Sequence, residues 1–231
     1  MRKLIAAAAL TLGAAPVQAA DLSVTVTNLT QGIYYTPFVL GAHGAGTDLM
    51  EPGEPATQSL RQVAECGDLS GVVADLNAAG ADVVENPASG LLAPGASATA
   101  TLSTSSGNDH LSLAAMLLPT NDGFVALDSE AIPSEPGTYT YYLPAWDAGS
   151  EANNELLATS GCSVGMAGIP ADPTGAAGSG GSGVTSQEAN GDVHIHRGNL
   201  GDTNASGGPS DLDSTVHRWQ NPVLQVRIQV Q

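Results

Sequence analysis

The chain has 231 residues, of which 42% are hydrophobic, 13% charged and 4% aromatic, and it contains 28 Gly and 14 Pro. This Gly and Pro content excludes a helix bundle or a coiled coil, and the ordinary apolar content excludes a disordered polyelectrolyte. The 23 acidic residues outnumber the 6 basic ones and give a net charge of −17. Such a surface repels nucleic acid and, without a bridging cation, anionic lipid.

The N-terminal residues have the pattern of a secretory signal peptide. Arg2 and Lys3 form a short basic start, residues 4–15 are apolar and Ala-rich, and small residues precede a predicted cut after Ala19. The apolar run is too short to span a bilayer as an anchor. We therefore expect residues 1–19 to be a leader and residues 20–231 to be a secreted or periplasmic chain without membrane insertion.

Strand patterns dominate the mature chain. Apolar and polar residues alternate over residues 22–27, 98–103 and 223–230, which is typical of strands with one buried face. Residues 110–118 form a mostly apolar run that fits a strand buried on both faces. Further strands are expected at 33–40, where Pro37 indicates an edge or a bulge, and at 123–127, 138–143 and 193–197. The predicted fold is all-β, a single antiparallel β-sandwich with long loops.

One or two short helices are expected between these strands. Ser59 and Gln62 form a capping-box pair, and Asp68 is a candidate N-cap for an apolar pattern that stops at Gly80. Residues 169–191 are dominated by Gly, Ser, Ala and Pro and predict a flexible connection or a long surface loop. Because a strong strand pattern follows, this segment is expected to return to the same sheet, so that residues 20–231 form one domain.

Cys66 and Cys162 are the two cysteines of the chain. In an oxidising compartment an even pair predicts a disulfide. Two buried free thiols are the alternative.

Three carboxylates follow predicted strands. Asp122 comes after the apolar run at 110–118, and Asp147 and Glu151 come after the strand at 138–143. Calcium takes six to eight oxygen ligands, mostly carboxylates and carbonyls on loops. Gly149 allows a tight backbone curl between Asp147 and Glu151, and Asp122 would join them if the two strands are neighbours. These residues predict a calcium site, with a solvated acidic loop as the alternative.

Two segments carry a resemblance to a known family: residues 117–124 (LLPTNDGF) and residues 144–151 (PAWDAGSE). Together with the leader they resemble the spondin N-terminal domain, the module of F-spondin and mindin, in its stand-alone bacterial secreted form. The resemblance covers about residues 22–230 and implies an eight-stranded antiparallel sandwich with one calcium at Asp122, Asp147 and Glu151. Two positions depart from the family pattern, because Glu151 stands where Asp is usual and Gly123 where an aromatic residue is usual.

A second candidate site is formed by His194 and His196. In a strand both imidazoles point to one face, as in some zinc and copper sites, and Asp192 and His217 could complete such a site. The alternative is a polar strand face hydrogen-bonded to neighbouring loops, because a two-residue histidine repeat is a weak motif.

The sequence predicts a secreted, non-catalytic, calcium-binding β-sandwich module for adhesion or for association with the extracellular matrix or envelope. Its expected partner is an extracellular or cell-surface macromolecule, either protein or glycan. Two alternatives stay open: a metal-dependent hydrolase that uses His194 and His196, and a purely structural envelope protein. Trp146 and Trp219 are interpreted as lids that rigidify the loops rather than as binding platforms.

Overall fold

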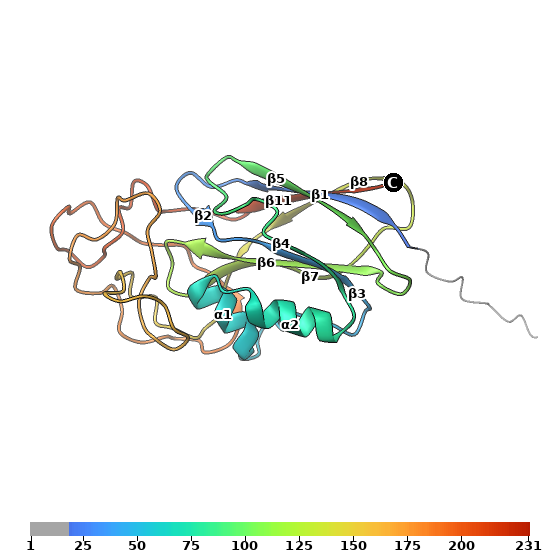
Figure 1. Cartoon of the computed structure of the whole chain (residues 1–231). Coiled ribbons are helices and arrows are strands. Elements are labelled where there is room, and N and C mark those ends of the chain that lie inside the picture. Colours follow the sequence, from blue (N-terminus) through green and yellow to red (C-terminus); the bar gives the residue numbers. More distant parts are fainter. Residues whose placement is uncertain (1–18) are drawn as a thin grey trace, which may run out of the picture.

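The computed structural model describes residues 19–231, and its strands form two antiparallel sheets that pack face to face (Figure 1). The predicted leader, residues 1–19, lies outside the described residues except for Ala19. A search of the described helices finds none with the length and apolar character needed to cross a bilayer. The prediction of an all-β sandwich with one or two short helices is confirmed, and the described residues contain two helices.

The first sheet has four strands in the order β5-β1-β11-β8. Its strands are β1 (Asp21–Asn28), β5 (Ser97–Ser103), β8 (Gly137–Leu143) and β11 (Leu224–Val230). The first and last strands of the described chain pair along their whole length, from Leu22 opposite Val230 to Asn28 opposite Leu224. Their apolar residues are buried alternately, as the period of two predicts, and they face the core between the sheets.

The second sheet has the order β10-β9-β7-β6-β3-β4, with β2 paired to β6 beside this path. Its strands are β2 (Tyr34–Tyr35), β3 (Val39–His43), β4 (Asp82–Glu85), β6 (His110–Leu118), β7 (Gly123–Ala131), β9 (Ala145–Asp147) and β10 (His194–Ile195). The described chain thus has eleven strands rather than the eight that the family resemblance implies. The extra strands are short, and strands of two to four residues show too little alternation to be recognised in sequence.

Two helices cover the outer face of the second sheet, α1 (Gln58–Cys66) and α2 (Ser70–Ala78) (Figure 1). Helix α1 begins at the N-cap Thr57, whose side chain accepts a hydrogen bond from the Leu60 N–H, and not at the expected cap Ser59. Val63 of α1 and Leu76 of α2 pack with apolar residues of β3 and β6. Strand β6 therefore has a core on each side, which explains its uninterrupted apolar run.

The expected strand at 33–40 is divided into β2 and β3. Pro37 lies between them, and it lacks the N–H that a continuous ladder needs. On its two sides the chain pairs with the same neighbour, because Tyr34 lies opposite Leu118 and Val39 opposite Ala114 of β6. The irregularity that Pro37 indicates is therefore an interruption of the strand.

The connections after β9 and β10, residues 148–193 and 196–223, are long and gather at one end of the sandwich (Figure 1). The predicted disulfide is confirmed: Cys66 at the end of α1 is bonded to Cys162 in the first of these loops, with their Cα atoms 5.5 Å apart. The disulfide thus attaches the loop end of the molecule to the helix layer.

Buried carboxylates hold these loops in place of regular secondary structure. Glu155 accepts hydrogen bonds from the Leu200 and Gly201 N–H groups at 2.6 and 2.8 Å and from the Ser210 hydroxyl at 2.7 Å. Asp211 likewise accepts bonds from three backbone N–H groups, those of residues 157, 180 and 181. These contacts satisfy loop N–H groups that no strand ladder reaches.

Candidate functional site

Strand pairing brings Asp122 and Asp147 together. Gly123, the first residue of β7, lies opposite Asp147, the last residue of β9, and the Ala148 N–H donates to the Asp122 carbonyl at 3.2 Å. The predicted route was different, because it required the strands at 110–118 and 138–143 to be neighbours. Strand β8 instead belongs to the other sheet, and the chain changes sheets between Leu143 and Ala145. The short strand β9 therefore carries Asp147 to Asp122.

The turn before Asp122 explains why residue 123 is glycine. The Thr120 hydroxyl donates to the Leu117 carbonyl at 2.6 Å and accepts from the Gly123 N–H at 3.0 Å. A Cβ atom at position 123 would lie 2.8 Å from the Thr120 oxygen. The hydroxyl of this chain thus occupies the space that a larger residue would need.

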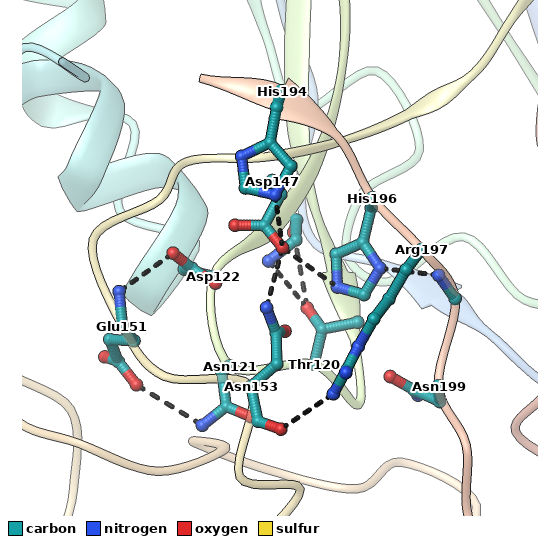
Figure 2. Close-up of polar contacts among 12 residues, drawn as sticks. Thr120, Asn121, Asp122, Asp147, Glu151, Asn153, His194, His196, Arg197 and Asn199 are labelled. Atoms are coloured by element: carbon teal, nitrogen blue, oxygen red, sulfur yellow. Dashed lines mark hydrogen bonds and ion pairs between the residues drawn. The ribbon is translucent and has the colours of Figure 1, made fainter. Parts of the chain in front are cut away.

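Asp122 is fully buried, and its two oxygens differ sharply (Figure 2). Oδ2 accepts hydrogen bonds from the Ser150 and Glu151 N–H groups at 2.8 and 3.0 Å. Oδ1 has no hydrogen-bond partner, which is true of only one other buried side-chain atom in residues 19–231. Burial, and after it the nearby Asp147 charge, raises the pKa of Asp122 to about 8. The hydrogen bonds from the Ser150 and Glu151 N–H groups stabilise the ionised form and oppose this shift.

Asp147 is also buried and is held by its own loop. Oδ1 accepts from the Gly149 N–H at 2.9 Å, and Oδ2 accepts from the Asn153 amide at 2.7 Å. Gly149 has a φ of 64°, and a Cβ there would lie 2.6 Å from the Asp192 carbonyl oxygen. Glycine is therefore required for both the curl of this loop and its close contact with the segment before β10.

Glu151 lies next to Asp122 through its backbone, but its carboxylate points elsewhere (Figure 2). Oε2 accepts from the Gly168 N–H at 3.0 Å and from the Asn121 amide at 3.4 Å. Burial raises the pKa of Glu151 to about 7. Its side chain would have to rotate away from Gly168 to share a cation with Asp122.

Strand β10 and the residue that follows it place the two predicted histidines, His194 and His196, beside Asp147 (Figure 2). The Nδ1 of His194 lies 2.8 Å from the Asp192 carbonyl, which can only accept, so Nδ1 carries a hydrogen. The lone pair of the neutral ring is therefore on Nε2, which lies 3.8 Å from Asp147 Oδ2. A ring that is held at Nδ1 and presents Nε2 to a carboxylate has the arrangement of a metal-binding histidine.

His196 has the opposite arrangement. Its Nδ1 accepts a hydrogen bond from the Gly198 N–H at 2.9 Å, so the hydrogen of the neutral ring is on Nε2. Nε2 is the second buried atom without a hydrogen-bond partner in the described chain, and it lies 3.7 Å from Asp147 Oδ2. Burial lowers the pKa of His196 to about 4, although Asp147 opposes this shift. The neutral ring packs against Trp219, with ring centroids 5.0 Å apart.

The oxygen and nitrogen donors lie close together, but they do not form a finished metal cage. No three His, Cys, Asp or Glu side chains within residues 19–231 are arranged as the ligands of one ion. The chemistry nevertheless fits a cation, because Asp122 Oδ1 is buried without a hydrogen-bond partner beside a second carboxylate. His217 does not join this group, since its Nε2 contacts Thr174 and Asp172 and its Nδ1 accepts from the Asp213 N–H.

Sequence reasoning missed the residues that orient these acids. Asn153 supports Asp147, and Asn121 contacts Glu151. Arg197 donates to the Asn153 carbonyl at 3.2 Å from the far side of the loop. The position of Asn153 close to Asp147 in the same acidic loop was an available signal, whereas nothing local connects Arg197 to that loop.

No protein-family model and no curated protein matches the chain. The assignment of function therefore depends on the site itself.

Proposed function

We propose that this chain is an exported, non-catalytic module that binds a divalent cation, calcium, at the loop end of the sandwich and associates there with a macromolecule outside the cell. The observation that carries the proposal is the unpartnered Oδ1 of buried Asp122 beside the Asp147 carboxylate. The resemblance to the spondin N-terminal domain points to the same two residues and adds Glu151. The disulfide is consistent with an oxidising compartment.

Electrostatics favour a cation at this position. Two adjacent carboxylates in a buried site repel each other, and without a cation Asp122 avoids the repulsion by keeping its proton. A divalent ion would remove the repulsion and displace that proton. Binding is therefore expected to strengthen as the pH rises through the pKa of Asp122.

The cation would also order the loop that follows β9. Asp122 already accepts the N–H groups of Ser150 and Glu151, and Asp147 accepts that of Gly149. A bound ion would displace the proton of Asp122, so that these N–H groups would donate to an ionised carboxylate rather than to a neutral acid. The same ion would thus define the shape of the recognition surface at the loop end.

Calorimetric titration and thermal unfolding with calcium test the proposal. We expect saturable binding and a stabilisation of about 2.7 kcal/mol at a hundredfold excess of calcium over its Kd. Asp147→Asn and Asp122→Asn should each abolish both effects, because each removes one of the two charges while keeping the side-chain shape. Asp75→Asn, at an exposed position of α2, is the matched control and should bind like the unmodified chain.

Absence of both binding heat and a shift in melting temperature would refute the calcium proposal. It would favour a purely structural envelope protein. Unchanged calcium binding by Asp147→Asn would also refute the assigned site.

A metal-dependent hydrolase is the second candidate, and His194 favours it. Its Nε2 lone pair faces Asp147, and imidazole nitrogen prefers zinc or copper to calcium. Metal analysis of the purified protein separates the two candidates. Stoichiometric zinc or copper that is lost in His194→Ala would support the second, whereas calcium binding that persists in His194→Ala supports the first.

A further inference from the structure

A hollow of about 510 Å³ is lined by residues that contact the candidate cation site, since Trp219 packs on His196 and Arg197 donates to Asn153. It is formed by the β1–β2 connection, the segment after β10 and the segment before β11. Arg197, Arg218 and Trp219 contribute to its lining, and the exposed side chains of Leu29 and Leu200 add apolar surface.

The two arginines make this hollow unusual in so acidic a chain. Residues 19–231 contain four basic side chains of the Lys and Arg type, and two of them line this one hollow. Among the described residues, Arg61 pairs with Glu65, whereas no ion pair joins Arg197 or Arg218 to a carboxylate. Two exposed guanidinium groups therefore keep their charge available for an external anion.

The geometry of the arginine side chain indicates which class of anion the hollow would bind. A guanidinium group presents a planar set of N–H donors that matches a carboxylate or sulfate in two parallel hydrogen bonds. Arg197 gives one donor to the Asn153 carbonyl, and its guanidinium makes no other hydrogen bond or ion pair to a side chain or carbonyl within residues 19–231.

Trp219 supplies a rigid apolar surface between these polar groups. Its ring is half-buried and packs on the buried ring of His196 at 5.0 Å, so it is fixed in place. A fixed indole beside hydrogen-bonding side chains suits a ligand with both an apolar face and polar edges. A sugar ring has this character. Trp219 thus acts as a lid on His196 and lines the hollow as well.

We propose that this hollow binds an acidic sugar of the hexuronic acid type within an otherwise neutral glycan. The sugar ring lies against Trp219, and its carboxylate is bound by Arg197 and Arg218. The net charge of −17 disfavours densely charged polyanions, because long-range repulsion grows with the charge of the ligand. The inference rests on the proposed recognition role, but it does not require the cation.

The test is an NMR titration of the full mature chain with cellobiouronic acid, in which one sugar of the disaccharide carries a carboxylate. Cellobiose, which carries a hydroxymethyl group where the acid has its carboxylate, is the matched ligand. We expect shifts at residues of the hollow and affinity about tenfold or more weaker for cellobiose. Arg218→Ala and Arg197→Ala should each weaken binding of the acid by a similar factor, and Arg218→Lys should restore only part of it.

Arg227→Ala is the control variant, because Arg227 is an exposed arginine on β11 and does not line the hollow. It should bind the acid like the unmodified chain, and both Arg227→Ala and Arg218→Ala should keep the melting temperature of the unmodified chain. Equal affinity for the two disaccharides, undiminished binding by Arg218→Ala, or tighter binding of a heparin oligosaccharide would overturn the proposal. So would the absence of saturable shifts at the hollow.

Parallel titrations in calcium and in EDTA separate this inference from the proposed cation site. Sugar binding in EDTA by a chain that does not bind calcium would support the hollow and refute the cation. Calcium binding without any sugar binding would support the cation site and refute the proposal for the hollow.

Discussion

Asp122 shows how one buried side chain links stability to pH. Its pKa is raised from 3.8 to about 8, so the folded chain keeps a proton over a range in which the unfolded chain has lost it. The free energy of unfolding therefore falls as the pH rises through this range. Glu151 acts in the same direction up to its pKa of about 7. His196 acts in the opposite direction, because its pKa is lowered from 6.5 to about 4.

Above the range in which His196 opposes it, we expect Asp122 to make the largest contribution to the pH dependence, with Glu151 adding a smaller part up to about pH 7. Between pH 6.5 and 8 the free energy of unfolding of the cation-free chain should fall by up to about 2 kcal/mol. Urea denaturation in EDTA across this range measures the slope. Asp122→Asn should remove most of the decline, Asp75→Asn should keep it, and saturating calcium should abolish it.

A stability that is independent of pH over this range, or a decline that Asp122→Asn leaves intact, would contradict the buried, protonated state of Asp122.

At the scale of elements, the loops at 148–193 and 196–223 are ordered by carboxylates rather than by strands. Each buried acid gathers N–H groups from segments far apart in sequence. Glu155, for example, contacts the backbone at Leu200 and Gly201 and the hydroxyl of Ser210. Part of the acidic composition therefore serves loop structure.

Glu155→Gln should destabilise this region by about 2–4 kcal/mol. Both carboxylate oxygens of Glu155 accept hydrogen bonds, so the amide group of Gln would face a donor in either orientation. Denaturant unfolding measures the loss, and amide hydrogen exchange should locate it at residues 200–201. Glu54→Gln, at an exposed position, is the control and should change stability by about 0.5 kcal/mol or less. Equal stability of the two variants would show that Glu155 does not hold the loops.

At the scale of the whole molecule, the disulfide connects two parts that the strand ladders do not join. It attaches the end of α1 to the loop at Cys162, across a sequence separation of 96 residues. Cross-links that close long loops restrict the unfolded chain most.

The double variant Cys66→Ser, Cys162→Ser should be destabilised by about 3–5 kcal/mol. Thermal and denaturant unfolding measure this loss. The unmodified chain in reductant serves as the comparison and should approach the same stability. A loss of less than about 1 kcal/mol would indicate that the loop end is held by its other contacts alone.

Much of the fold was predictable because the burial of a strand determines the order of apolar and polar residues along it. The alternation of Leu22, Val24 and Val26 records a one-sided strand, and the continuous apolar run of β6 records a strand with a core on both faces. The cysteine pair was predictable from its count and the predicted compartment, and the structure confirms its bond. The expected strand at 193–197 is present as the shorter β10, whereas β9 was not predicted, and the site depends on both of them.

Local residue order established the all-β class, the main strands and the acidic turns. It did not establish that the chain changes sheets after β8 and so brings Asp147 next to Asp122. Nor did it establish that His194 lies opposite Asp147, or that Arg197 and Arg218 line one hollow. Those contacts join segments separated by tens of residues. The period of the apolar residues indicates which face of a segment is buried. Which other segments that face contacts depends on how the two sheets, the helix layer and the loops pack together.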